Sequence, residues 1–379
     1  MTPRDTRRSV PGDDRGRYDG RHTMRLPRSY LTLGIAAGAL ALVLAASAGA
    51  AFAQQSAEEF FRSRKEMNFI TSSPPGGGYD AYSRLFARFM SKHLPGNPTI
   101  LVNNMPGGGG IRAANFLYNV APKDGSTIAL LDRGVATAPL LYGEESKAQF
   151  DAVKFNWLGS AMRENGMAAV STRVPVQSIE DVKTREVIVG ATAPEQDPAM
   201  FPRLLNELLG TKFKVVYGYG GQPDTFLAIE RTELDGLFMS GWSGNGRAYV
   251  REKIKEGKMR LLVQMSATGD PTHSDTPTIM SLMKNDNDRQ IVELILSRLA
   301  LGRPFLSPPG IPADRVAMLR DAFQKAATDP ELLEEAVKLR LAIDPIFGEE
   351  AQALIAKIYQ SSPQLVLRAR NIVKISDAK

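Results

Sequence analysis

Residues 74–94, PPGGGYDAYSRLFARFMSKHL, place a glycine-rich turn directly before a helix pattern with apolar residues at three- and four-residue spacing. The segment before it, MNFIT at 67–71, predicts a short strand. Residues 99–131 repeat the order, with a strand (TILV), a second glycine turn (PGGGG), a helix over 111–120 and a third strand (TIALL). Strands that alternate with helices predict a mainly parallel sheet with helices on both faces.

The same alternation returns further along the chain. Strands are predicted at 186–190, 213–217, 234–239 and 259–265, and helices between them at 198–209, 223–230 and 246–255. A last strand at 301–306 precedes helices at 312–328, 330–340 and 348–360. This C-terminal segment has too few strands for a domain of its own, so we expect it to pack on the first domain. The prediction is a two-domain α/β fold with two crossings between domain 1 (54–160 and 298–379) and domain 2 (161–297).

The N-terminal segment has the features of an export signal. Arg25 and Arg28 precede a stretch, 31–53, that is almost entirely Leu, Ala, Val and Gly and ends in Ala-Phe-Ala. A basic start, an apolar centre and a small-x-small end predict a cleaved secretory signal peptide, so 1–53 is read as an extension plus signal. With such a signal, translation can start at Met24 as well as at Met1. A retained transmembrane anchor is the alternative, because the apolar run is long enough to span a bilayer.

The amino-acid composition limits the classes of protein to which the chain can belong. The chain has 379 residues, of which 43% are hydrophobic and 23% charged, as in a globular protein with a large core. Residues 1–53 hold eight Arg against four Asp, so most of the formal charge of +6 belongs to the leader and the remainder is nearly neutral. That balance argues against nucleic-acid binding. The absence of cysteine excludes a lipid-anchored lipoprotein and thiolate or Cys-ligated metal chemistry. We expect a monomer in the periplasm.

Both glycine turns fit G-x-G-x-x-A, at 76–81 and 108–113, which is also a dinucleotide fingerprint. The second finds an acidic residue, Asp132, at a following strand end, but Pro106 precedes its glycines and an exported protein meets no nicotinamide pool. The backbone N–H groups of such a loop suit any anion, carboxylates included. The glycines could also serve only as tight turns. Two such loops at the carboxyl ends of neighbouring parallel strands favour a ligand crevice.

The residue pattern contains no motif typical of a catalytic site. The segment after the leader holds two histidines, His93 and His273, and residues 241–245 miss G-x-S-x-G at the last position. There is no Walker motif and no His-rich metal cluster. We therefore expect no catalytic residue, metal or cofactor, and a nicotinamide-dependent oxidoreductase is the one enzyme alternative.

The two glycine motifs, PPGGGYDAYSRLFARFMSKHL and ILVNNMPGGGGIRAANFLYNVAPKDGSTIALL (100–131), resemble the N-terminal signature of the periplasmic receptors of tripartite tricarboxylate transporters, the Bug-type receptors. Further similar stretches are EVIVGATAPEQDPAMFPRLLNELLG (186–210), YGYGGQPDTFLAIERTELDGLF (217–238) and LGRPFLSPPGIPADRVAML (301–319). The resemblance runs from about Asn68 to the C-terminus. It implies a hinged solute-binding protein that holds a small organic anion between two domains and delivers it to membrane transporter subunits. A receptor that presents its ligand to a membrane signalling partner is the alternative.

The resemblance also implies a ligand site with two walls. Carried onto this sequence, the first wall is Gly77, Gly78, Tyr79 and Asp80, with Asp80 holding a bridging water or a ligand amino or hydroxyl group. The second wall comprises Ala191, Thr192, Ala193 and Gln196, with Asp197 nearby. To these we add Arg133, after the third strand, and Trp242. The sequence departs from the family pattern at Tyr79, where the family has Thr or Ser, and at 190–201, which lacks its serines and histidine.

Overall fold

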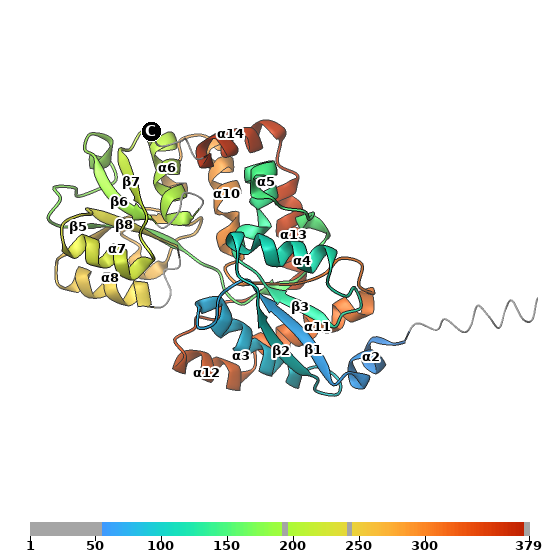
Figure 1. Cartoon of the computed structure of the whole chain (residues 1–379). Coiled ribbons are helices and arrows are strands. Elements are labelled where there is room, and N and C mark those ends of the chain that lie inside the picture. The colour runs from blue at the N-terminus through green and yellow to red at the C-terminus, as the bar shows by residue number, and fades with distance from the viewer. Residues whose placement is uncertain (1–54, 192–195, 241–244, 375–379) are drawn as a thin grey trace, which may run out of the picture. The chain divides into compact units, whose positions relative to one another are not determined.

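The computed structural model describes residues 55–191, 196–240 and 245–374 (Figure 1). The predicted leader and three of the predicted site residues, Thr192, Ala193 and Trp242, lie outside these ranges. From Ser56 onward the chain forms one compact unit. In the described ranges, no helix has the length and apolar character needed to cross a membrane.

The first sheet, sheet A, has six strands in the order β11-β4-β10-β3-β1-β2. Parallel pairing is confined to β1, which lies between β2 and β3, whereas β10 and β11 pair antiparallel. The strands are β1 (Glu66–Thr71), β2 (Thr99–Asn104), β3 (Thr127–Leu130), β4 (Asn156–Ser160), β10 (Pro304–Ser307) and β11 (Ile346–Phe347).

The second sheet, sheet B, has five strands in the order β7-β6-β8-β5-β9. Here β6 is parallel to β7 and β8, and β5 is antiparallel to β8 and β9. The strands are β5 (Gly166–Ser171), β6 (Val187–Ala191), β7 (Phe213–Tyr217), β8 (Gly236–Ser240) and β9 (Met259–Met265). The chain passes from sheet A to sheet B between β4 and β5, and returns between β9 and β10.

Both sheets are thus mixed rather than mainly parallel, which corrects the sequence prediction. The antiparallel pairs involve β4, β5, β10 and β11, the strands next to the two crossings or after the return. The sequence pattern did not identify β4 and β5, NWLGS and GMAAVS. Every residue of β5 is buried, so the strand has no polar face and no alternation to read.

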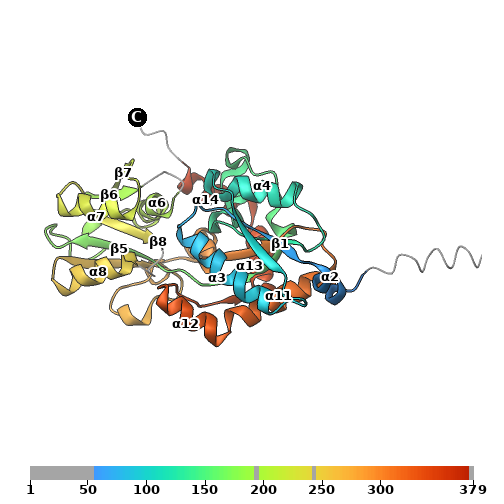
Figure 2. The ribbon, with the colours of Figure 1, turned by 60° about the horizontal axis from the view of Figure 1, so that its bottom comes forward.

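Helices cover both faces of sheet A. On one face, α2 (Ala57–Ser63), α3 (Gly78–Lys92), α11 (Ala313–Ala327) and α12 (Pro330–Lys338) enclose an aromatic core (Figures 1 and 2). Phe86, Phe305 and Phe323 are its centre, with ring centroids 4.7–5.5 Å apart. The opposite face carries α4 (Ile111–Asn119), α5 (Ala138–Tyr142), α13 (Gly348–Tyr359) and α14 (Pro363–Val373).

Sheet B is covered by α7 (Gln222–Glu230) and α8 (Asn245–Lys255) on one face, and by α6 (Asp197–Leu209) and α9 (Ile279–Leu282) on the other. One apolar cluster runs without interruption from Trp157 in sheet A to Phe201 on α6. Helix α10 (Asp286–Ala300) supplies the connection, because it packs against α13 and α14 as well as α9. The predicted domain boundary at 297/298 falls inside this helix, which the sequence pattern missed.

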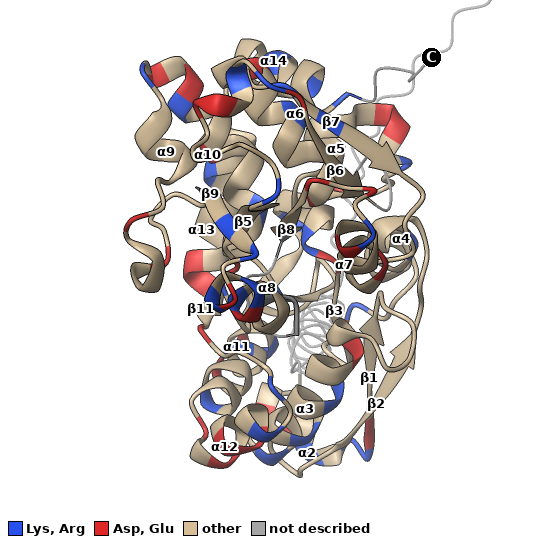
Figure 3. Ribbon diagram, turned by 90° about the vertical axis from the view of Figure 1, so that its left-hand side faces the viewer, with Lys and Arg blue, Asp and Glu red and all other residues tan. Residues whose placement is uncertain are grey.

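Charges on the helices are mixed in sign. Figure 3 shows basic and acidic residues on the same helices, among them α3, α8 and α12. Many are exposed pairs within one helix, such as Lys338 with Glu334 at 2.7 Å and Lys325 with Asp321 at 2.8 Å. Exposed pairs of this kind stabilise a helix by only a few tenths of a kcal/mol, about 0.3–0.5. The charges relevant to the site are buried ones.

Candidate functional site

The first glycine turn is a tight loop that ends at the N-terminus of α3. Gly76 has φ +80°, which favours glycine, and a Cβ on Gly77 would lie 2.4 Å from Ser73 Oγ, so a side chain there would displace that hydroxyl. Helix α3 begins at Gly78 with no side-chain cap. Within the described part of the chain, the backbone N–H groups of Gly78 and Tyr79 have no acceptor. The loop therefore presents free donors at the positive end of a 15-residue helix.

Asp80 braces this loop from within. Its buried carboxylate accepts hydrogen bonds from Gly76 N (2.9 Å), Arg84 Nε (3.0 Å) and Asn104 Nδ2 (2.8 Å). Burial raises the pKa of the Asp80 carboxyl, but the bonds from Arg84, Gly76 and Asn104 outweigh burial and lower it overall. Asn104 Nδ2 also donates to Ser73 O at 2.8 Å. The carboxylate thus ties the loop to the start of α3 and the end of β2.

Tyr79 joins three segments at one hydroxyl. Its Oη accepts from Arg133 N at 3.2 Å and donates to Gly302 O at 3.3 Å. The Arg303 guanidinium lies over its ring, with Cζ 4.4 Å from the centroid. Burial, with the Asp132 charge, raises the pKa of Tyr79 to about 12, so the phenol stays neutral. A Thr or Ser at this position could not provide the aromatic face on which Arg303 packs.

The second glycine turn, η1 (Gly108–Gly110), is a spacer beside the short helix η2 (Arg133–Ala136). Gly110 has φ +90°, and a Cβ there would lie 3.1 Å from both Asp132 Cβ and Val135 Cγ2. Asp132 uses Oδ1 to cap η2, accepting from Gly134 N at 2.8 Å. The glycine therefore lets η1 approach η2 closely.

Beside Tyr79, five charged side chains from distant segments form a buried cluster, which we call the arginine cluster. Arg133 binds Asp197 through Nε (3.1 Å) and Nη2, and Glu164 through Nη1. Arg303 Nη1 lies 2.7 Å from Glu164 Oε1, and Arg298 Nε lies 3.4 Å from Asp197 Oδ1. Both carboxylate side chains are only 1% exposed. The cluster thus connects η2, α6, α10 and both crossings.

The arginine cluster has more positive than negative charge. Three guanidinium groups face two fully buried carboxylates, and the nearest further carboxylate, Asp132, is 34% exposed and 4.0 Å from Arg298. Burial lowers the pKa of Arg133, but Asp197 and Glu164 raise it well above its ordinary value. Arg303 Nε is buried and has no hydrogen-bond partner in the described ranges. A Cβ on Gly78 would lie 3.9 Å from Arg303 Nη2, so the cluster borders the free N–H groups of α3.

The structure brings several predicted residues together. Tyr79 contacts Arg133, and Arg133 contacts Asp197, while Gly77, Gly78 and Asp80 form the adjoining loop. Ala191 is the buried last residue of β6, and Gln196 is the exposed residue that precedes α6. Thr192, Ala193 and Trp242 lie outside the described residues.

Sequence reasoning missed Glu164, Arg298 and Arg303. Each lies in or beside a segment whose structure the pattern did not reveal: the crossing after β4, helix α10 and the return to β10. The one available signal was position, because all three flank the predicted domain crossings. In the described ranges, the site included, no group of three or more His, Cys, Asp or Glu side chains is placed to hold a metal ion.

Comparison with known proteins identifies the fold to which this chain is similar. No protein-family model matches the chain. The UPF0065 protein in the gbd 5'region of Cupriavidus necator is 27% identical over 311 residues, which are 80% of this chain and 86% of that protein.

Solved structures agree over most of the chain. A TctC solute binding protein from Polaromonas has a TM-score of 0.63 at 20% identity, covering 82% of this chain and 98% of its own. The periplasmic binding protein BugD has a TM-score of 0.56 at 22% identity (81% and 97% covered). MatC from Rhodopseudomonas palustris, solved with bound malate, has a TM-score of 0.54 at 19% identity (82% and 99%).

The fold is therefore the two-domain α/β fold of periplasmic solute-binding proteins. Within that class, the structural neighbours are TctC- and Bug-type receptors, which confirms the resemblance predicted from the glycine motifs. These neighbours are binding proteins rather than enzymes.

Proposed function

We propose that this chain is a periplasmic receptor that captures a small organic carboxylate and delivers it to a membrane transporter. The observation that carries the proposal is the pair of free N–H groups at Gly78 and Tyr79, next to a buried cluster with more guanidinium than carboxylate groups. A helix N-terminus and a guanidinium whose buried Nε has no hydrogen-bond partner in the described ranges, that of Arg303, both favour a negative ligand group. Malate in MatC shows that a neighbour of the same fold was solved with a carboxylate.

In this proposal, the ligand carboxylate accepts from the N–H groups of Gly78 and Tyr79, with the Arg303 guanidinium alongside. Asp80 does not touch the carboxylate, since its own oxygens already have three donors, but it holds the loop in place. Ala191 and Gln196 contribute the second wall from sheet B, and the other two predicted residues of that wall, Thr192 and Ala193, lie outside the described residues.

We further propose that closure is a hinge motion of domain 1 (54–160 and 298–379) against domain 2 (161–297). The Arg133–Asp197 ion pair joins η2 of sheet A to α6 of sheet B, so it forms only when the two are close. A ligand stabilises the closed state by the difference between its binding free energies for the closed and the open state.

The proposal is tested by thermal-shift and calorimetric titration with mono-, di- and tricarboxylates. At least one should stabilise the protein, with a shift that grows with the logarithm of its concentration. Gly78→Leu places a side chain over the site, and its Cβ has only Arg303 Nη2 within 4 Å, so the fold should tolerate it. We expect at least a tenfold rise in Kd, or about 1.4 kcal/mol.

Gly221→Leu is the matched control, because Gly221 precedes helix α7 of sheet B and its Cβ would have only Pro223 Cδ, at 3.6 Å, within 4 Å. This variant should bind the same carboxylate with unchanged Kd. No response to any carboxylate, or an equal loss in both variants, would contradict the proposed site.

A further inference from the structure

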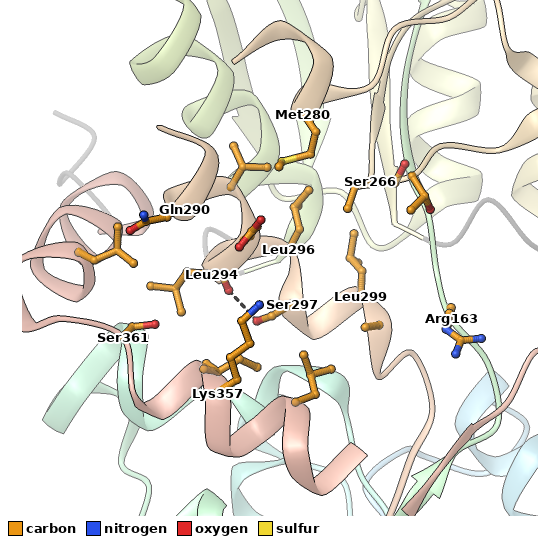
Figure 4. A pocket seen from close by; sticks show the side chains of 18 of the residues that line it. Arg163, Ser266, Met280, Gln290, Leu294, Leu296, Ser297, Leu299, Lys357 and Ser361 are labelled. Atoms are coloured by element: carbon orange, nitrogen blue, oxygen red, sulfur yellow. Dashed lines mark hydrogen bonds between the residues drawn. The ribbon is translucent and has the colours of Figure 1, made fainter. Parts of the chain in front are cut away.

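A cavity of about 790 Å³ lies between α10, α13, the start of α14 and the segment after β9 (Figure 4). None of the predicted ligand-binding residues lines it. Its volume is in the range of small-molecule sites. Buried apolar side chains form much of its wall: Leu294, Leu296, Leu299 and Ile358.

Four charged side chains line this cavity, and two of them are already neutralised. Arg163 pairs with Asp344 (3.0 Å) and Glu350 (3.2 Å), and Glu164 belongs to the arginine cluster. The other two, Glu293 on α10 and Lys357 on α13, have no ion pair or hydrogen bond within the described part of the chain. One negative and one positive group thus remain available, on different helices.

Each available charge has a hydroxyl four residues further along. Glu293 and Ser297 share one face of α10, and Ser297 Oγ, which donates to Leu294 O at 2.7 Å, retains lone pairs that can accept. Ser361 follows Lys357 beyond the end of α13, and its hydroxyl has no hydrogen bond within the described ranges. Figure 4 shows Lys357, Ser297 and Ser361 around the cavity. The α10 pair accepts hydrogen bonds, and the Lys357–Ser361 pair donates them.

We propose that this cavity is a second ligand site, for a small zwitterion with an apolar body, namely an apolar amino acid. The ammonium binds Glu293 and Ser297, the carboxylate binds Lys357 and Ser361, and the hydrocarbon part packs on Leu294, Leu299 and Ile358. Glu293 and Lys357 are both exposed to solvent, so the preference for a zwitterion comes from charge complementarity. A simple carboxylate brings a like charge close to Glu293, and a simple amine brings one close to Lys357, whereas a zwitterion places an opposite charge beside each.

The test is calorimetric titration of the full chain with leucine and phenylalanine as probes. Two analogues of leucine isolate each charge: 4-methylpentanoate lacks the ammonium and 3-methylbutylamine lacks the carboxylate. We expect at least one amino acid to bind, and its single-charge analogue to bind at least tenfold more weakly. No binding of either amino acid, or equal affinity for 4-methylpentanoate and leucine, would overturn the proposal.

Variants locate the binding. Lys357→Met and Glu293→Gln should each raise the Kd of the bound amino acid at least tenfold. Lys325→Met, at an exposed lysine on α11 paired with Asp321, should not change it. Gly78→Leu should also leave it unchanged, which separates this site from the carboxylate site. Loss of amino-acid binding in Gly78→Leu, with wild-type binding in Lys357→Met, would assign the ligand to the first site and overturn the second.

Discussion

Asp80 is a buried charge whose role is to shape a loop. Its three donors come from the glycine turn, from the next turn of α3 and from β2, so one carboxylate sets the position of all three. We predict that Asp80→Asn lowers the free energy of unfolding by about 1–3 kcal/mol, because the amide leaves buried donors poorly paired. Urea denaturation measures this. Asp321→Asn, at an exposed helix position, should stay within about 0.5 kcal/mol of wild type.

Because of Asp80, we expect the stability of the folded protein to depend on pH. The pKa of Asp80 is lower in the folded protein than in the unfolded chain, so its contribution to stability is fully present above about pH 4. That contribution is lost as the pH falls through the lowered pKa. Asp80→Asn should therefore lose less stability than wild type between about pH 5 and pH 2. Parallel stability curves for the two proteins over that range would contradict the assignment.

The arginine cluster illustrates a different use of charge. Burying an ion costs several kcal/mol, and a buried pair often does no more than recover that cost. The pairing of Arg133 with Asp197 and Glu164 therefore serves geometry more than stability, since it joins η2, the first crossing and α6 at one guanidinium. That geometry leaves Arg303 beside Gly78.

At the scale of elements, the two glycine turns have different structural roles. The first presents N–H groups, and the second brings η1 against η2. We predict that Gly110→Ala lowers the free energy of unfolding by about 2–4 kcal/mol, from a positive φ and from contacts with Asp132 and Val135. Because η2 carries Arg133, the variant should also bind the carboxylate ligand more weakly.

Gly109→Ala is the control for this prediction. Gly109 also has a positive φ, +57°, but no atom lies within 4 Å of its Cβ position. Only the backbone strain applies there, about 1–2 kcal/mol. Chemical denaturation compares the two variants, and equal losses of stability would mean that close packing of η1 on η2 does not matter.

At the scale of the whole molecule, we expect residues 1–53 to direct the protein out of the cytoplasm. We predict export to the periplasm and cleavage after Ala53, so that the mature chain begins at Gln54. Cell fractionation and intact-mass measurement check both points, and a protein without 1–53 should stay in the cytoplasm. A full-length form that sediments with membranes would instead support the anchor alternative.

The two sheets are joined by more than the crossing strands. The apolar cluster that runs from Trp157 to Phe201, together with α10 and α14, connects the helices of sheet A to those of sheet B. The proposed hinge motion would therefore have to bend beside a shared core. The cavity next to α10 lies in this connecting region, where a bound ligand would touch both α10 and α13.

Sequence patterns predicted some elements and missed others for a physical reason. Helix α3 was readable because a glycine turn, a helical apolar period and a polar face occur within 20 residues. Strand β5 has no polar face, and α10 begins with the polar run DNDRQ and is apolar over several faces later on. Periodicity reports exposure on one side, so elements buried between layers leave little signal.

The candidate site was predictable only in part. Gly77, Gly78 and Tyr79 follow one another in the chain, so a motif can show them together. Glu164, Arg298 and Arg303 belong to other segments and meet Arg133 and Asp197 only when the chain folds.

The amino-acid sequence alone determined the alternation of strands and helices, the two glycine turns and the apolar leader, because backbone conformation and local burial depend on neighbours along the chain. Only the tertiary structure showed that both sheets are mixed, that the Asp80 carboxylate accepts three hydrogen bonds, and which partner each buried charge has. An ion pair depends on distance in space, and that distance is set when segments far apart in the chain, such as those of Arg133 and Asp197, 64 residues apart, pack together.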